Sequence, residues 1–343
     1  MPDQDDLIEQ RKAEHISLSL DTGSQHTSNV FAKYRLPYRA LPELNLDDVD
    51  TSTEFLGHTL SQPLIISSMT GGTAHALDIN RNLAIAAEKC GVAIGVGSQR
   101  IALEKEEAKA SFMVVREYAP NAVIIANMGA IQLNNGRGID DFREVVDMIQ
   151  ANALYLHLNP LQEALQPEGD TNYAALLPKI KKLVRNIGVP VFVKEVGHGI
   201  DAQTAKELLA LGVAGIDVAG VGGTSYAWIE AKRAKNANFA DWFKDFGIPS
   251  DQAISQIYHL NKKSTIVASG GVRSPLDGLK AGVLGADLYA AATPFLEAAL
   301  QKDPEALLKQ LNDWQRGLQV AMFSCGIDSW SKRRQLTLTL DAS

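Results

Sequence analysis

The sequence predicts an α/β fold in which eight parallel strands, each followed by a helix, close into a (β/α)8 TIM barrel with an N-terminal extension. Three observations predict this fold. Eight short apolar segments recur along the 343 residues, amphipathic segments separate them, and most successive segments begin about 20 to 37 residues apart. Parallel strands need crossover connections, so the alternation indicates a parallel sheet. Eight units favour closure, and an open doubly wound sheet is the alternative.

The apolar segments have the length of buried strands, and the segments between them have helical periodicity, as in LDINRNLAIAAEKCG and IDDFREVVDMIQAN. The sixth and seventh strands are farther apart than the others, so residues 221–262 should contain an insertion. The expected strands are residues 63–68, 92–98, 122–127, 153–159, 190–195, 214–220, 265–271 and 286–292.

The first 62 residues precede the barrel. They are expected to form an arm and a segment that caps the barrel's bottom, where TSTEFLGHTL predicts a short strand or hairpin. Residues 63–343 are expected to form the barrel, and the whole chain a single domain.

Composition excludes several functional classes. The formal net charge is −7, so a nucleic-acid partner is not expected. Cys90 and Cys325 lack metal-ligand spacing and fit a reducing, cytoplasmic location. The acidic N-terminus does not resemble a signal peptide, and no run of 18 uncharged apolar residues predicts a membrane span.

The strand ends are polar and glycine-rich, and the active site of a barrel lies at those ends. The strongest signal pairs GGVR (270–273), after the seventh strand, with AAA (290–292), at the end of the eighth. Barrels often bind phosphate at this place through backbone N–H groups, and Arg273 could add a forked charge. A glycine turn with a solvated arginine is the alternative.

Lys194 ends the fifth strand, and alternation places it on the same face as Phe192. An ammonium group inside a barrel mouth needs an anionic partner, because its burial is otherwise costly. A reduced flavin, which carries negative charge near N1 and O2, would be one such partner. A Schiff-base role and pairing with a Glu or Asp on a neighbouring loop are the alternatives.

The fourth strand and its loop, HLNPLQE, place His157 and Asn159 on a polar face that should look into the mouth. Glu163, next to Gln162, suits a Mg²⁺ ion that keeps waters and completes its shell with substrate phosphate oxygens. A carboxylate that only favours the helix start is the alternative. Far upstream, RKAEH gathers Arg11, Lys12 and His15 into a cationic cluster that suits a diphosphate, and ordinary surface charge is the alternative.

Taken together, RKAEH, SSMTGGT, GVGSQR, ANMGA, HLNPLQE, VPVFVKEVGHGI, GIDVAGVGGTS and ASGGVR resemble the type 2 isopentenyl-diphosphate isomerases, in order and in spacing, from residue 11 to about 295. GGVR alone is common among phosphate-binding barrels, whereas RKxEH, MTGGT and HLNxLQE together are specific. The resemblance implies interconversion of isopentenyl and dimethylallyl diphosphate in isoprenoid precursor biosynthesis. It also implies FMN that is active when reduced, Mg²⁺, NADPH or NADH as reductant, and a homo-tetramer or homo-octamer.

Carried over by position, the resemblance implies roles for residues from nearly every strand end. Gln162 would be catalytic, with N5 of FMN as the acid/base, and Glu163 would bind the metal. The residues implied to contact substrate are Arg11, Lys12, His15, Ser98, Arg100, His157, Asn159 and Gln162. Those implied to hold FMN are Ser68, Met69, Thr70, Ser98, Asn127, Lys194, Thr224, Gly271, Val272, Arg273, Ala291 and Ala292.

Two positions depart from the family pattern. Ala219 stands where serine is common, so one phosphate donor is missing, and Tyr226 stands where tryptophan is common, so one wall of the substrate pocket is expected to differ. Three alternatives remain at this point. A 2-hydroxy-acid oxidoreductase would need a histidine–arginine pair, but the connection before the seventh strand offers only His259. A relative of inosine-monophosphate dehydrogenase would need a cysteine after the glycine-rich loop, and a non-catalytic flavin-binding protein would need neither RKxEH nor HLNxLQE.

Overall fold

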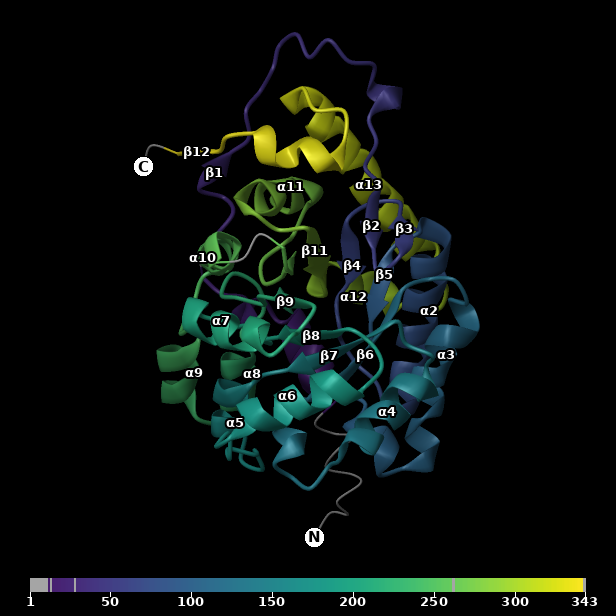
Figure 1. Ribbon diagram of the computed structural model, residues 1–343, viewed down its shortest axis with the longest axis vertical. Helices are drawn as coiled ribbons and strands as arrows, with labels where there is room; N and C mark the ends of the chain where they lie inside the picture. Colours follow the sequence, from purple (N-terminus) through teal and green to yellow (C-terminus); the bar gives the residue numbers. More distant parts are fainter. Residues whose placement is uncertain (1–11, 13, 28, 261–262, 342–343) are drawn as a thin grey trace.

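The computed structural model describes residues 12, 14–27, 29–260 and 263–341. Its centre is a closed barrel with strand order β10-β11-β4-β5-β6-β7-β8-β9, and the barrel pairs are all parallel. This confirms the predicted (β/α)8 fold and its eight strands (Figure 1). The strands are β4 (Leu64–Ile66), β5 (Ala93–Gly95), β6 (Ile124–Gly129), β7 (Ala153–His157), β8 (Val191–Lys194), β9 (Gly215–Asp217), β10 (Thr265–Ala268) and β11 (Leu288–Ala291).

Successive side chains along each strand point to opposite faces of the sheet. The barrel therefore has two apolar clusters, one inside it and one between its outer face and the helices. Phe192 points into the barrel and packs with other inward residues, whereas Val191 and Val193 point outward, where the helices pack. The predicted orientation of the fifth strand is therefore confirmed. The helices around the barrel include α2 (Ala74–Cys90), α3 (Ala110–Tyr118), α4 (Ile139–Met148), α6 (Leu176–Asn186), α7 (Ala202–Ala210), α10 (Ser250–Leu260), α11 (Pro275–Leu284), α12 (Thr293–Ala299) and α13 (Glu305–Cys325).

Helix α2 illustrates how the sequence sets the helix ends. The Thr73 side chain caps its start by accepting a hydrogen bond from the N–H of Ala76. Gly91 ends it in the left-handed conformation, with φ 61°, which glycine adopts without steric cost. Apolar residues at helical spacing, such as Ile79 and Leu83, face the barrel and are buried.

The predicted insertion between β9 and β10 contains two extra helices, α8 (Tyr226–Arg233) and α9 (Ala237–Phe243), before α10. Helix α8 packs against α5 (Pro160–Leu165) and α9. Because α5 follows β7, this packing brings the insertion over the same end of the barrel as the HLNPLQE loop.

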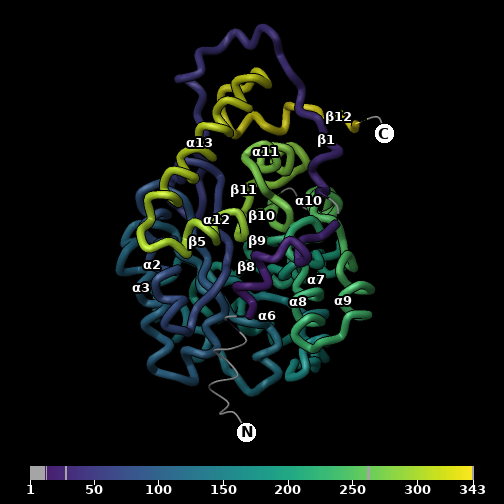
Figure 2. The backbone as a smooth tube through the Cα atoms, turned by 180° about the vertical axis from the view of Figure 1, so that it is seen from behind, coloured from purple at the N-terminus to yellow at the C-terminus, as the bar shows by residue number. Residues whose placement is uncertain are grey.

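The opposite end of the barrel is covered by the hairpin of β2 (Thr53–Phe55) and β3 (His58–Leu60). Phe55 joins the apolar cluster inside the barrel, and its ring meets the Phe192 ring edge-on at 5.6 Å. Burial of both rings closes this end against water. At the same end, β1 (Tyr34–Arg35) pairs with β12 (Thr339–Leu340), so segments near the two chain ends lie side by side (Figures 1 and 2).

The N-terminal segment runs from the end of the barrel where the carboxyl ends of the strands lie to β1 at the opposite end. Its first described residues, 12 and 14–20, are helical, and Figure 2 shows the purple chain passing α7 and α8 on its way to β1. Backbone hydrogen bonds hold it there: Ser225 N–H donates to Ser24 O at 2.8 Å, and His26 N–H donates to Gly223 O at 2.8 Å. Among the described residues, no helix is both long enough and apolar enough to cross a membrane.

Candidate active site

A cavity of about 690 Å³ opens at the carboxyl ends of the barrel strands. Its size suits a cofactor or a small ligand. The described candidate residues all line it, although they come from nearly every strand end, whereas Arg11 lies outside the described residues. The predicted residues that line it are Lys12, His15, Ser68, Met69, Thr70, Ser98, Arg100, Asn127, His157, Asn159, Gln162, Glu163, Lys194, Thr224, Gly271, Val272, Arg273, Ala291 and Ala292.

The glycine-rich rim after β10 leaves backbone donors open to the cavity. Gly271 has a φ of 91°, and a Cβ there would come within 2.6 Å of Gly222 O, so only glycine fits. The backbone N–H groups of Gly271, Val272 and Ala292 donate to no other described residue. Three free donors beside the start of α12 form a place where an anion's oxygens can bind.

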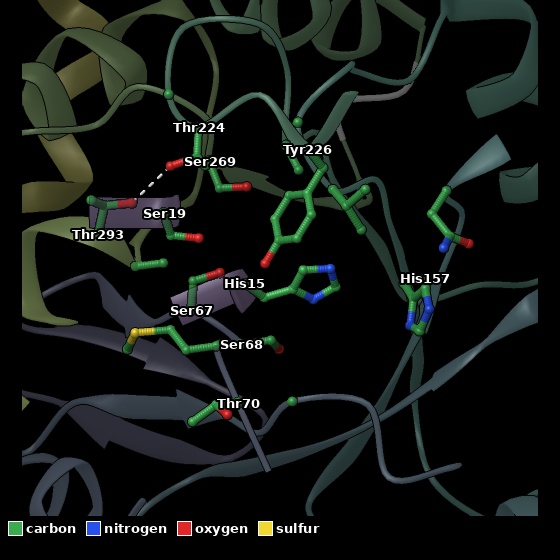
Figure 3. Close-up of a pocket in the computed structure, with 18 of the residues that line it drawn as sticks. His15, Ser19, Ser67, Ser68, Thr70, His157, Thr224, Tyr226, Ser269 and Thr293 are labelled. Atoms are coloured by element: carbon green, nitrogen blue, oxygen red, sulfur yellow. Dashed lines mark hydrogen bonds between the residues drawn. The ribbon is translucent and has the colours of Figure 1, made fainter. Parts of the chain in front are cut away.

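Arg273 lines the same rim, and hydrogen bonds hold both its backbone and its side chain. Its backbone N–H donates to Asp277 Oδ2 at 3.1 Å, which belongs to the cap of α11. Its guanidinium donates to Gln25 Oε1 at 3.3 Å, and Gln25 in turn donates to Thr224 Oγ1 at 3.1 Å. Thr224 and Thr293 hydroxyls meet at 2.9 Å (Figure 3). Because the backbone N–H of Arg273 is already engaged, this residue can contact a ligand on the rim through its side chain but not through its backbone.

Lys194 reaches the cavity floor and is only 6% exposed. Its ammonium donates to the Glu195 carbonyl at 2.6 Å and lies 6.0 Å from the Tyr155 ring centre. Asp217, fully buried on the neighbouring strand, is its partner in the sheet register. A carboxylate neighbour is thus present, although it lies on a strand and not on a neighbouring loop as the alternative for this lysine supposed.

His157 has a defined tautomer. Asn127 Nδ2 donates to Val96 O at 3.0 Å, so Asn127 Oδ1 is the atom that accepts from His157 Nδ1–H at 2.8 Å. Burial, together with the positive charges of Lys194 and Arg100, lowers the pKa of His157 to about 3. The ring is neutral, and its Nε2 lone pair remains available.

Gln162 is oriented by Glu230, a buried carboxylate on α8. Gln162 Nε2 donates to Glu230 Oε1 at 2.9 Å, and His15 Nε2 donates to the same oxygen at 2.8 Å. Arg233 donates to Glu230 Oε2 at 2.5 Å. Burial disfavours the charge of Glu230, but His15, Gln162 and Arg233 outweigh it and lower its pKa to about 2. Because a carboxylate only accepts, the Gln162 amide oxygen must point away from it, and it accepts from Asn159 Nδ2 at 3.2 Å.

Glu163 lies in the first turn of α5, where the helix dipole favours a carboxylate. Oε1 accepts from Asn159 Nδ2 at 2.8 Å, and Oε2 accepts from the N–H of Asp170 at 2.7 Å. No group of three or more metal-ligating side chains occurs within the described part of the chain. If Glu163 binds Mg²⁺, waters and ligand oxygens would therefore have to supply the rest of the metal's coordination shell.

The N-terminal helix forms one wall of the cavity. Lys12 donates to the Gly71 carbonyl, and the His15 ring meets the Tyr226 ring edge-on at 5.8 Å. Figure 3 shows both rings inside the pocket, with His157 on the facing side. Tyr226, one of the two departures from the family pattern, thus forms a wall as expected. Ala219, the other, lines the cavity and has a strained φ of 35°.

Sequence reasoning missed Glu230, Asp217 and Gln25. Glu230 follows Tyr226 by four residues on α8, so helical spacing from the predicted pocket wall could have found it. Asp217 is an acidic residue inside the apolar strand GIDVAG, which is itself a signal. Gln25 reaches the rim through tertiary contacts, and no local pattern marks it.

Comparison with known proteins shows the family to which the chain belongs. A model of the FMN-dependent dehydrogenase family matches residues 11–131 and 145–339. An isopentenyl-diphosphate delta-isomerase of Synechococcus sp. is 44% identical over 333 residues, covering 96% of this chain and 95% of that protein. The one of Cronobacter sakazakii is 42% identical over 340 residues, 98% of each. A solved mandelate oxidase with benzoyl-formic acid has a TM-score of 0.65 over 96% of this chain and 94% of that one, and its 17% identity shows the fold alone.

Proposed function

The chain belongs to the family of isopentenyl-diphosphate delta-isomerases, within the wider FMN-dependent dehydrogenase family, and from this premise we propose that it interconverts isopentenyl and dimethylallyl diphosphate in isoprenoid precursor biosynthesis. The proposal rests on one observation: two different sets of anion-binding groups line the same cavity. Free backbone donors line one rim, and cationic and polar side chains, including Lys12, His15 and Arg100, line the other. One cavity can thus take a flavin phosphate and a substrate diphosphate.

The residues present fit FMN. The Gly271, Val272 and Ala292 N–H groups suit its phosphate, and the buried Ser68 hydroxyl has no hydrogen-bond partner in the described structure, so it can serve a ligand. Bound reduced FMN would supply an electron-rich ring that can take up and release a proton at N5. We assign to FMN the residues Ser68, Met69, Thr70, Ser98, Asn127, Lys194, Thr224, Gly271, Val272, Arg273, Ala291 and Ala292.

The reaction adds a proton to one carbon and removes a proton from another, with no net redox change. The residues of this chain then act by binding and orientation. Contacts of His15 and Lys12 hold the N-terminal helix against the cavity. The helix there helps to exclude water from the reacting carbons. We assign Gln162 the placement of a proton at the reacting end, because Glu230 fixes the direction of its amide.

We assign the substrate diphosphate to the cationic and polar groups on the mouth side of the cavity. Its oxygens would complete the shell of a Mg²⁺ ion held by Glu163, which alone brings too few ligands. Arg11, Lys12, His15, Ser98, Arg100, His157, Asn159 and Gln162 are the proposed substrate residues. NADPH or NADH as reductant, a cytoplasmic location and a homo-tetramer or homo-octamer complete the proposal and rest on the family resemblance.

Oxidation of a 2-hydroxy acid is the second candidate, because the mandelate oxidase shares the fold. His259, the histidine that the sequence offered for this chemistry, is exposed on α10 and does not line the cavity. Of the histidines that do, His15 is bonded through Nε2 to Glu230, whereas His157 is bonded to Asn127 through Nδ1 alone. This arrangement favours the isomerase.

The test begins with the visible spectrum of the purified chain, which should show bound flavin. Turnover of isopentenyl diphosphate, followed by product analysis after reduction of the flavin, then separates an isomerase from a carrier. Dimethylallyl diphosphate is the expected product. Bound flavin without isomerisation would leave a flavin-binding protein, and consumption of mandelate instead would favour the oxidase.

A further inference from the structure

A buried lysine and a buried aspartate lie on neighbouring strands, Lys194 at the floor of the cavity and Asp217 behind it. Lys194 and Asp217 end the neighbouring strands β8 and β9 and are register partners. Both side chains are on the inward face, because Phe192 and Gly215, two residues earlier on each strand, meet inside the barrel. Lys194 is 6% exposed and Asp217 is 0% exposed, so solvent screens neither charge well.

Asp217 has only partial compensation from other groups. The Ser269 hydroxyl donates to Oδ1, whereas Oδ2 has no hydrogen-bond partner among the described residues. Burial raises the pKa of Asp217, and the ammonium of Lys194 is the strongest influence against that rise. Lys194 itself donates to a neutral carbonyl. The carboxylate of Asp217 thus depends on the ammonium of Lys194 for its main electrostatic compensation.

The two residues differ in their access to a ligand. Lys194 lines the cavity, whereas Asp217 does not and lies behind it. An anionic group behind a cation reduces the positive potential that the cation presents in front. Asp217 can therefore change the charge felt in the cavity without touching what binds there.

We infer that Asp217 is the counter-ion of Lys194, and that the pair sets how strongly the site favours reduced over oxidised flavin. This inference rests on the proposed function. Lys194 alone would hold an anionic reduced ring tightly and withdraw electron density from it. Asp217 offsets part of that charge, so the reduced ring stays electron-rich enough to accept a proton. It is a positioning residue that acts through Lys194.

The pair therefore has opposite effects on flavin binding. Removing the carboxylate charge in Asp217→Asn should strengthen binding of reduced FMN relative to oxidised FMN by roughly tenfold or more, because a unit charge within about 12 Å changes an equilibrium by that factor at an effective dielectric constant near 20. Lys194→Met should change the ratio in the opposite direction. Tyr289→Phe is the matched control: it removes a buried hydroxyl that lies outside the cavity and contacts Gln62, and it removes no charge, so the ratio should stay close to that of the wild type.

The experiment measures the affinities of oxidised and reduced FMN for each full-length variant without oxygen, together with the flavin's midpoint potential. An unchanged ratio in Asp217→Asn would overturn the inference, as would a shift toward oxidised FMN. If Asp217→Asn does not fold, Asp217→Ser takes its place, because it also removes the carboxylate charge while Lys194 stays in place. It should shift the ratio toward reduced FMN by a similar factor, and an unchanged ratio would overturn the inference.

These outcomes differ from a failure of the proposed function. A wild-type chain that binds no flavin would overturn both. A wild-type chain that binds flavin and isomerises its substrate, with ratios that do not respond to Asp217, would overturn the counter-ion role alone.

Discussion

Replacing Glu230 by glutamine should destabilise the fold and disorganise the site together. The buried carboxylate accepts hydrogen bonds from His15, Gln162 and Arg233, which lie on the N-terminal helix, on α5 and on α8. In Glu230→Gln, the NH2 group of the new amide would face some of these donors without a bond. Arg233 would also lose its most buried counter-charge. Removing one member of a buried charged network is strongly destabilising.

The magnitude follows from the pKa of Glu230, which falls from the usual 4.5 to about 2. That difference corresponds to roughly 3 kcal/mol of folding free energy near neutral pH. Because the folded-state pKa is depressed, this stabilisation is fully present above about pH 4.5 and is lost as the pH falls toward about 2. The advantage of the wild type over Glu230→Gln should therefore shrink to less than half by roughly pH 3.

Urea unfolding at neutral pH and at stepwise lower pH measures both quantities. Glu117→Gln, a change at an exposed position on α3, is the control and should alter the unfolding free energy by no more than about 0.5 kcal/mol. Equal stability of Glu230→Gln and the wild type at neutral pH would refute the reasoning. A difference that does not depend on pH would show that the loss comes from packing and not from the carboxylate's charge.

Two further predictions concern substrate and metal. Glu163→Gln keeps the shape but removes a hard anionic oxygen, so a Mg²⁺ titration of turnover should require more metal and show weaker diphosphate binding, with FMN content unchanged; an unaltered Mg²⁺ dependence would place the metal elsewhere. Arg11→Ala should lower the apparent affinity for isopentenyl diphosphate by roughly 10- to 150-fold, and Lys12→Ala by less, because arginine makes forked bonds to phosphate. Steady-state kinetics with a measurement of bound FMN test this, and loss of flavin instead of substrate affinity would contradict it.

The barrel could be predicted because its signal is repetitive. Eight apolar segments separated by helices leave few folds, and alternation alone placed Phe192 and Lys194 on the inner face of the fifth strand. The strand ends were predicted too long. Ser67 and Ser68, for example, lie beyond the end of β4 and line the cavity, because side chains at the carboxyl ends of strands leave the sheet to form loops.

The predictions were weaker where tertiary packing brings distant segments together. Glu230 acts on Gln162 across the contact between α8 and α5, and no spacing in the sequence specifies that contact. The guanidinium of Arg273 lines the cavity as predicted and also donates to Gln25 of the N-terminal segment, a partner that the sequence did not indicate. Such partners follow from how an insertion and an arm pack on the barrel, which local periodicity does not contain.

The most direct test of the central claim is isomerisation as a function of the flavin's redox state. Purified chain with FMN, Mg²⁺ and isopentenyl diphosphate should form dimethylallyl diphosphate without oxygen after the flavin is reduced by NADPH, NADH or a chemical reductant. The same mixture with oxidised flavin should form almost none. Equal turnover in the two states, or reduction-dependent turnover of a chain from which FMN has been removed, would contradict the proposed role of flavin in this cavity.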